Sequence, residues 1–380
     1  MLRFRFGRSR PWHKSGAERR RDALTVRGAV GGWTLSKRDK PTPESPPHRK
    51  ARTTDSVDAS QITTSVEVAV GISLKDLTNL YLLLSVKGFG PQKFRELHLS
   101  QIPATEALEN PERLPAGGKR WDGFRSDLGG IPAEMRELCH RRAVRQILTA
   151  HKLGASVLTY DHPSYPLRVY NSNDPIPILY TRGSLDVLQQ RNAVACVGSR
   201  KIRAPYSALQ TEFIRHAVGC NFTIVSGFAL GADTISHETA YRNGGRTICV
   251  MPGGLERPFP PENRKLWDEL LCCQRALFVS EFPFGMRASA LTLRKRNKLI
   301  VAFSQGVLIS QSSVNGGAMN AYRFAREQRK PVATFADDGM PDTSGNRLIS
   351  HERRPEDEMF ADKPELDSYS RWLQRLSSST

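Results

Sequence analysis

The 380-residue sequence lacks the motifs of a metal site, a nucleotide-hydrolysing enzyme and a membrane protein. It has no Walker lysine motif and no GxGxxG fingerprint. No apolar run is long enough to span a bilayer, and the chain does not open on the apolar stretch of a secretory signal. Its six cysteines show no paired metal-ligand spacing, and several fall in strand or helix patterns, as buried reduced thiols do: Cys139, Cys196, Cys220, Cys249, Cys272 and Cys273. We therefore expect no metal, no cofactor, no membrane association and a cytoplasmic location.

Acidic residues are scarce relative to basic ones. The chain has 38 Asp and Glu against 56 Lys and Arg, a net charge of +18. Residues 1–55 hold fifteen basic and five acidic residues, so they carry 15 − 5 = +10 and the remainder carries 18 − 10 = +8. This excess favours a polyanionic partner such as nucleic acid. Residues 1–60 lack hydrophobic periodicity and predict a basic disordered tail, so a scaffold that attracts polyanions mainly through this tail is one alternative.

Short apolar runs alternate with helical patterns through most of the second half of the chain. Such runs are typical of buried parallel strands, and they occupy residues 193–197, 223–225, 246–251, 276–281, 306–310 and 331–335. Strands that alternate with helices predict an open, mostly parallel, Rossmann-like α/β sheet. Right-handed crossovers would place the loops after these strands at one edge of that sheet.

A small helical domain over residues 70–150 precedes the predicted sheet domain, which we place at 151–350. Two helical patterns flank the turn Gly88-Phe89-Gly90. In a helix–hairpin–helix, backbone N–H groups of such a turn face a phosphate, whereas in an ordinary αα-corner the glycines only cap a helix. The sequence leaves both open. A proline-rich extended connector follows the boundary, and residues 351–380 predict a C-terminal tail.

Two consecutive strands end in glycine and small polar residues just where a helix begins. Gly198, Ser199 and Arg200 follow the first strand, and the segment from Ser226 and Gly227 to Gly231 follows the second. Glycine lets backbone N–H groups approach an anion, and the helix N-terminus supplies partial positive charge. Arginine can add two donors to a phosphate. We interpret these loops as a phosphate-binding rim; the alternative is that the glycines only form tight turns.

Residues 294–298 form the densest run of charge in the region predicted to fold, and apolar residues follow them directly. Positive charge at a helix N-terminus opposes the helix dipole by about 0.3 to 1 kcal/mol, and a bound phosphate would offset this cost. The alternative is a solvated charged face. Together with the glycine loop at Gly316, this run completes the predicted DNA-binding set: Arg294, Lys295, Arg296, Asn297 and Lys298.

Phenylalanines lie in or near the same loops, and no catalytic set accompanies them. Basic loops with exposed rings suit single-stranded nucleic acid, although core packing is the usual role of each ring taken alone: Phe228, Phe259, Phe282 and Phe284. His237 follows Asp233 by one helical turn, but no nucleophile pairs with it. Glu281, at a strand end, has no carboxylate partner. The sequence predicts a binding crevice and no enzyme.

The ordered series of these motifs resembles the DNA-processing protein A family (DprA, also called Smf). The resemblance spans residues 75–350 and rests on VGSR, SGFALGAD, GGRTICVMPGGLERPFPPEN, SEFPFG, RKRNKLI and SGNRLI. It implies a small N-terminal helix–hairpin–helix or SAM-like domain and a Rossmann-like domain that binds single-stranded DNA. It also implies protection of incoming DNA, loading of the RecA recombinase in natural transformation, and a homodimer. Arg200 and the basic run match the family's phosphate-gripping positions.

The chain departs from the family's usual pattern at several of these positions. Leu293 stands where an aromatic residue is usual, Lys298 replaces an arginine, and Ala232 replaces an isoleucine. Asn315 and Asn320 also differ from the usual glycine-loop residues. A second hypothesis is a nucleotide-binding sensor or a phosphoribohydrolase-like enzyme on a related sheet. The loop PGGLE at 252–256 lacks the Gly-Thr pair of those enzymes, which argues against their chemistry.

Overall fold

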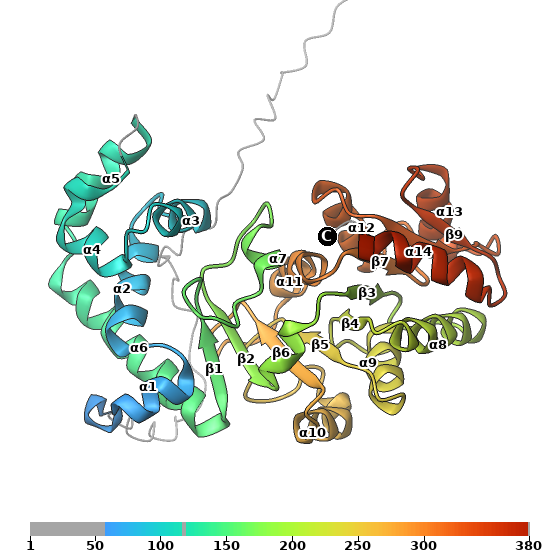
Figure 1. Ribbon diagram of the computed structural model, residues 1–380, viewed down its shortest axis with the longest axis horizontal. Coiled ribbons are helices and arrows are strands. Elements are labelled where there is room, and N and C mark those ends of the chain that lie inside the picture. The colour runs from blue at the N-terminus through green and yellow to red at the C-terminus, as the bar shows by residue number, and fades with distance from the viewer. Residues whose placement is uncertain (1–57, 116–118, 379–380) are drawn as a thin grey trace, which may run out of the picture. The chain divides into compact units, whose positions relative to one another are not determined.

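The computed structural model describes residues 58–115 and 119–378. The predicted basic tail therefore lies almost wholly outside the described residues. Within them, a nine-stranded sheet has the order β1-β2-β6-β5-β4-β3-β7-β8-β9 (Figure 1). Its strands are Ala155–Leu158, Leu179–Gly183, Ala193–Val197, Thr223–Ser226, Thr247–Val250, Ala276–Ser280, Gly306–Ile309, Val332–Phe335 and Glu358–Phe360.

The six predicted strands correspond to β3 through β8, which confirms the prediction of a mostly parallel α/β sheet. Every residue in these six strands is buried, as strands covered by helices on both faces must be. Only β2 runs against the other strands; it pairs antiparallel with β1 on one side and with β6 on the other. Strand β2 forms the end of the predicted proline-rich connector.

Helices cover both faces of the sheet and form two separate cores. One core includes Trp267, Ile300 and Tyr322, and the other includes Phe213, Phe360 and Trp372. The covering helices are α8 (Ala204–Gly219), α9 (Ala232–Arg242), α10 (Arg264–Cys272), α11 (Ala290–Phe303), α12 (Ala318–Glu327), α13 (Ser344–His351) and α14 (Leu366–Ser378). These helices leave the strand-end loops as the sites where backbone groups can face a ligand.

The strand order reverses direction beside β3. The chain proceeds from β3 through β4 and β5 to β6 on one side, and then β7 returns to pair with β3 on its other side. Ligands of open α/β sheets bind outside the carboxyl ends of the strands at such a switch point. The loops after β3, β4 and β7 therefore form the edge where a ligand is expected to bind.

Six helices precede the sheet: α1 (Thr64–Val70), α2 (Leu74–Ser85), α3 (Pro91–Leu99), α4 (Ala104–Glu109), α5 (Lys119–Gly129) and α6 (Ala133–Leu153). The turn between α2 and α3 is anchored by Phe89, which is buried and stacks on Phe124 with a centroid separation of 4.9 Å. The hydroxyls of Tyr81 and Tyr180 lie 2.6 Å apart and join α2 to β2. Both observations are compatible with a phosphate-binding helix–hairpin–helix and with an ordinary αα-corner. A role of this turn in binding therefore stays a prediction.

The residues after 350 differ from the predicted C-terminal tail. Strand β9 extends the sheet beside β8, and α14 packs on α8. Tyr369, Trp372, Leu373 and Leu376 of α14 are all buried, which is the spacing of one helical face. A Cβ at Gly306 would come within 2.8 Å of the Leu376 side chain, so the glycine lets β7 and α14 pack closely without displacing that side chain. The segment before α14 is acidic and contains proline, so the sequence predicted a tail and missed this short amphipathic helix.

No single helix among the described residues is long and apolar enough to cross a membrane. Helices α1 and α2 meet that length and composition only when taken together, and they are bent by 58° at their junction. The part of the chain that the structure describes also holds no group of three or more His, Cys, Asp or Glu side chains placed to bind a metal ion.

Candidate nucleic-acid interface

The loop after β3 packs closely against the loops after β7 and β4. A Cβ on Gly198 would overlap the hydroxyl of Ser310 and come within 2.9 Å of the Ala232 side chain. The carbonyl of Ser199 accepts a hydrogen bond of 3.1 Å from the Ala232 N–H at the start of α9. Arg200, at the end of this loop, is exposed. The small residues thus fix the backbone and leave the arginine in solvent.

Gly231 brings the second loop against the first. Its φ of +77° is a left-handed conformation that glycine adopts without strain. A Cβ there would lie 2.5 Å from the carbonyl oxygens of both Ser199 and Arg200. This close approach of two backbones holds Arg200 beside the N-terminus of α9.

Arg296 of the basic run is buried, with an exposed fraction of 5%. Its guanidinium lies directly on Gly227, where any Cβ would overlap it. It donates to the Val250 carbonyl at 3.0 Å and to the Asp233 carboxylate at 3.3 Å. Burial lowers the pKa of Arg296, the Asp233 carboxylate opposes this shift, and the charge of Arg200 adds to it. Arg296 therefore ties α11 to the ends of β4 and β5 and to α9.

Arg200 and Arg296 line one small cavity of about 90 Å³. Its other walls are apolar, and Leu293, the residue that replaces the family's usual aromatic, is one of them. Leu230 and Phe259 at its mouth are 39% and 40% exposed. The Nε of Arg296 has no hydrogen-bond partner among the described residues. The arrangement combines two cations with exposed apolar surface, and the lining is Arg200, Phe228, Ala229, Leu230, Pro252, Phe259, Pro260, Leu293 and Arg296.

The rest of the basic run points elsewhere, because successive helical residues turn by about 100°. Lys295 pairs with Glu281 at 3.2 Å, and Lys298 pairs with Asp174 of the connector at 2.8 Å. Asn297 donates to the Gly317 carbonyl at 3.4 Å. Arg294 is exposed, and no described residue pairs with it. Of the predicted cations, then, the structure brings Arg200 and Arg296 together, while Lys295 and Lys298 have carboxylate partners.

Several other predicted residues hold the loops in place. Ser226 is buried and donates to the Cys196 carbonyl at 2.6 Å. Gly316 packs against Ser312, where a Cβ would overlap the hydroxyl. Phe228, Phe282 and Phe284 are buried, so among the four phenylalanines considered only Phe259 offers a ring to solvent.

Of the two titratable residues considered for catalysis, His237 is buried in the framework and Glu281 is half-buried. His237 contacts the Gly227 carbonyl through Nε2 and the Thr247 hydroxyl through Nδ1 at 2.7 Å. Burial lowers its pKa to about 4, so the ring is neutral at pH 7. Burial raises the pKa of Glu281, and the ammonium of Lys295 opposes that shift. These contacts give both residues a structural role in the framework.

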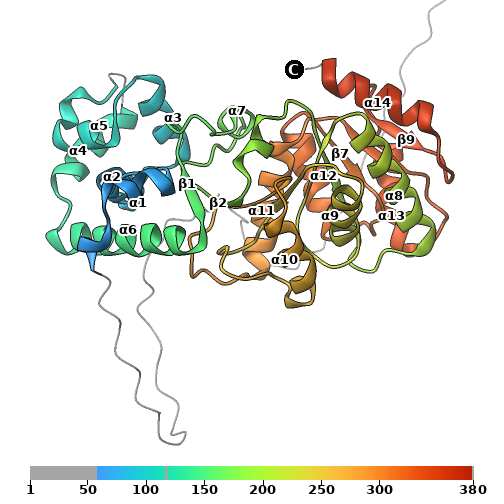
Figure 2. The same ribbon diagram turned by 60° about the horizontal axis from the view of Figure 1, so that its bottom comes forward.

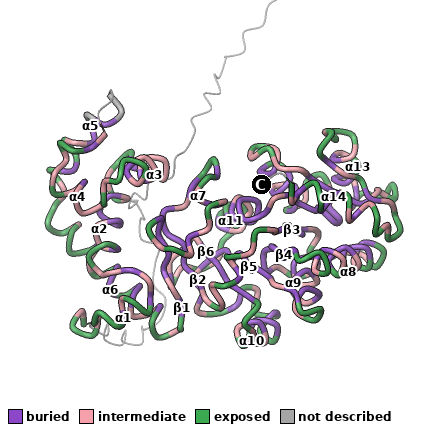
Figure 3. The backbone as a smooth tube through the Cα atoms, in the orientation of Figure 1, coloured by how far each residue is buried: buried purple, intermediate pink, exposed green. Residues whose placement is uncertain are grey.

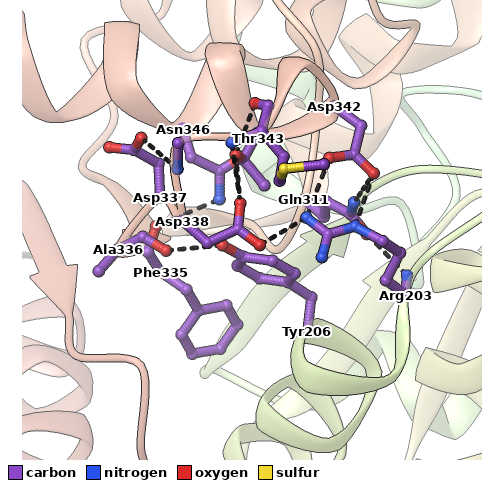
Figure 4. A network of polar contacts seen from close by, with 12 residues as sticks. Arg203, Tyr206, Gln311, Phe335, Ala336, Asp337, Asp338, Asp342, Thr343 and Asn346 are labelled. Atoms are coloured by element: carbon purple, nitrogen blue, oxygen red, sulfur yellow. Dashed lines mark hydrogen bonds and ion pairs between the residues drawn. The ribbon is translucent and has the colours of Figure 1, made fainter.

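Arg203 was not predicted to take part, yet it anchors the loop that carries Arg200. Its guanidinium donates to Asp342 at 2.7 Å and to Asp338 at 2.7 Å (Figure 4). Its N–H donates to the Gln311 side chain after β7 at 2.8 Å. The hydrogen bonds with Asp342 and Asp338 raise the pKa of Arg203. The sequence offered no signal for this contact, because the acidic loop lies more than a hundred residues away along the chain.

Comparison with known proteins assigns the family. The family model of DNA recombination-mediator protein A matches residues 156–353, which is 198 of the 380 residues and just over half of the chain. The chain belongs to the DNA recombination-mediator protein A family. The match covers every loop of the interface and leaves out α1 to α6, β9 and α14.

Relatives from this family are similar to part of the chain, as the family model is. The Smf protein of Synechocystis is 34% identical over 191 residues, which cover 49% of this chain and 48% of that protein. The Smf protein of Escherichia coli is 30% identical over 237 residues, which cover 60% of this chain and 62% of that protein. The chain thus spans about half to two thirds of these relatives. The DprA structure from Streptococcus pneumoniae, 22% identical with a TM-score of 0.54 over 78% of this chain and 94% of that one, has the same fold.

Proposed function

We propose that this chain binds single-stranded DNA along the carboxyl edge of its sheet and acts there as a recombination mediator. The observation that carries the proposal is the cavity shared by Arg200 and Arg296, with Leu230 and Phe259 exposed at its mouth. Membership of a family named for mediating DNA recombination supports the same conclusion.

The chemistry of the cavity suits a single strand. The exposed guanidinium of Arg200 can donate two hydrogen bonds to one phosphate. The half-exposed ring of Phe259 offers a surface on which a base can stack, with a typical contribution of about 1 to 3 kcal/mol per base. A duplex keeps its base faces stacked inside, so it can use the cations but not the apolar surface. This difference favours the single strand.

The ion pairs on α11 divide the basic run into binding and supporting residues. Arg294 is free to contact a phosphate that continues beyond Arg200, because no described carboxylate neutralises it. Arg296 acts through its charge and by holding the Gly227 loop, since its guanidinium is buried against Asp233. Lys295 and Lys298 contribute less, because Glu281 and Asp174 offset their charges.

The finer parts of the proposal rest on family membership. We infer that the chain protects incoming single-stranded DNA in natural transformation and loads the RecA recombinase onto it. We also infer that it works as a homodimer in the cytoplasm and without enzymatic turnover. A nucleotide-binding enzyme that uses this crevice is disfavoured by the size of the cavity: about 90 Å³ is far below the roughly 300 to 1,000 Å³ of sites that enclose a small molecule. A strand that lies across the edge needs no such enclosure.

The test is a titration of the purified chain with oligo-dT and with a duplex of the same length. Arg200→Ala should weaken binding of the single strand by about tenfold or more and should lower the salt slope by about 0.7, the value for one phosphate contact. Arg215→Ala, which removes an exposed cation of α8 that pairs with Glu212, is the matched control. Equal binding by Arg200→Ala and Arg215→Ala would contradict the proposal, and turnover of a nucleoside monophosphate would favour an enzyme.

A further inference from the structure

Helix α6 carries a strongly basic outer face that lies outside the crevice and outside the segment matched by the family model. Its last thirteen residues, 141–153, contain four Lys or Arg and no Asp or Glu. The helix packs on α1, α2 and β1 through its other side, and its positions alternate between buried and exposed along its length (Figure 3). Figure 2 shows it running toward β1.

Three of these cations lie on one ridge. Arg141, Arg145 and Lys152 are exposed, and their spacings of four and seven residues place them within about 40° of one another around the helix axis. Along the axis they are about 6 Å and about 10.5 Å apart. Arg145 and Lys152 pair with no described residue, and Arg141 has only a loose pair with exposed Glu137 at 3.6 Å. Arg145 and Lys152 have no such counter-charge, and exposed cations on one ridge repel one another unless an anion lies along it.

The fourth cation of α6 lies on the side nearer the sheet. Arg142 stacks over the Tyr81 ring at 4.3 Å, and the hydroxyl of Tyr81 contacts that of Tyr180 in β2. This contact gives Arg142 a packing role, so we leave it out of the proposed surface.

A short, well-anchored loop connects α6, through the buried side of the helix, to the start of α11. Gln146 of α6 accepts from the Phe284 N–H at 2.8 Å and donates to its carbonyl at 3.2 Å. Five residues later Ser289 caps α11, so the loop 284–289 spans at most about 20 Å even when extended. The Gly254 N–H bonds to the Met286 carbonyl at 2.9 Å and holds the loop against the turn after β5.

Charge along this loop is also positive. Arg287 is exposed, and no described residue pairs with it. The carboxylate of Glu256 accepts a hydrogen bond from the Gly285 N–H of this loop. Beyond Ser289 the chain enters α11, which carries Arg294 and, at Leu293 and Arg296, lines the cavity with Arg200.

We infer that the ridge of Arg141, Arg145 and Lys152 is a second contact surface for the phosphate backbone of a single strand that continues from the crevice. The inference rests on the proposed function, because the same strand must first occupy the crevice. The ridge offers cations without exposed rings, so it would hold phosphates regardless of base sequence. It extends the footprint of the protein by a few nucleotides and affects only strands long enough to reach it.

The experiment compares a short and a long oligo-dT, about 6 and about 24 nucleotides, chosen to bracket the usual footprint of a single-strand-binding domain. The test variant is Arg141→Gln/Arg145→Gln/Lys152→Gln in the full chain. The control variant, Arg215→Gln/Arg242→Gln/Lys265→Gln, removes the same charge from exposed cations of α8, α9 and α10 that each have a carboxylate neighbour.

The test variant should bind the short strand as the wild type does, which also shows that it is folded. It should bind the long strand about tenfold more weakly, as expected for the loss of three exposed ion pairs. Its salt slope for the long strand should fall by about 2, at about 0.7 per lost phosphate contact. The control variant should match the wild type with both strands.

Wild-type affinity and salt slope for the long strand in the test variant would overturn the inference. An equal loss in the test and control variants would overturn it too, since only net charge would then matter. Arg200→Ala separates this outcome from failure of the proposed function, because it should weaken the short and the long strand alike. If the wild-type chain binds neither strand, the proposed function and the inference are both refuted.

Discussion

Replacing Asp233 by Asn would leave the guanidinium of Arg296 buried without its counter-charge. The two side chains are only 8% and 6% exposed and lie 3.3 Å apart. Removing one partner of a buried ion pair typically costs about 3 to 5 kcal/mol, because the remaining charge stays desolvated. Arg296 also borders the cavity, where water can approach it, so we expect a loss of about 3 kcal/mol in the free energy of unfolding.

Urea-induced unfolding followed by tryptophan fluorescence measures this loss. The matched control is Asp268→Asn in α10, which makes the same chemical change in an exposed pair with Arg264 at 3.9 Å. Such exposed helical pairs contribute about 0.3 to 0.5 kcal/mol. The double variant Asp233→Asn/Arg296→Met should recover much of the lost stability, because it removes the stranded charge. Equal small losses for Asp233→Asn and Asp268→Asn would refute the assignment of Arg296 as a buried residue of the loop framework.

Two further predictions concern the framework around the interface. His237 has a pKa of about 4 in the folded chain against about 6.5 unfolded, so the unfolded state binds the proton first as the pH falls. Its contribution to stability should therefore be complete above about pH 6.5 and should decline by about 3 kcal/mol toward pH 4; His237→Gln should flatten this part of the pH dependence of unfolding, and an unchanged profile would refute it. Trp372 of α14 is fully buried, so Trp372→Ala should cost about 3 to 5 kcal/mol in thermal or urea unfolding, whereas a variant as stable as the wild type would mean that the helix adds nothing to the core.

Features that depend on neighbours along the chain could be predicted from the sequence. Strands β3 to β8 are continuous apolar runs, and a strand covered on both faces needs no more than that local composition. Their alternation with helices implied the parallel sheet. The glycines after β3 and β4 marked the loops correctly, because a backbone that approaches another as closely as Gly231 approaches Ser199 and Arg200 requires glycine. The ordered motifs were enough to identify the family.

Which side of each element faces the core, and what lies there, only the tertiary structure decided. The basic run looked like one exposed cluster. Yet Arg296 is buried and pairs with Asp233, which lies 63 residues earlier in the chain. Its neighbours Lys295 and Lys298 pair with Glu281 and Asp174. The hydrogen bonds between Arg203 and Asp342 join segments more than a hundred residues apart. Helix α14 packs against one face of the sheet, and no pattern of neighbouring residues in the sequence identifies that face. A side chain's charge is written in the sequence, but its burial and its partner depend on contacts that exist only after distant segments have packed together.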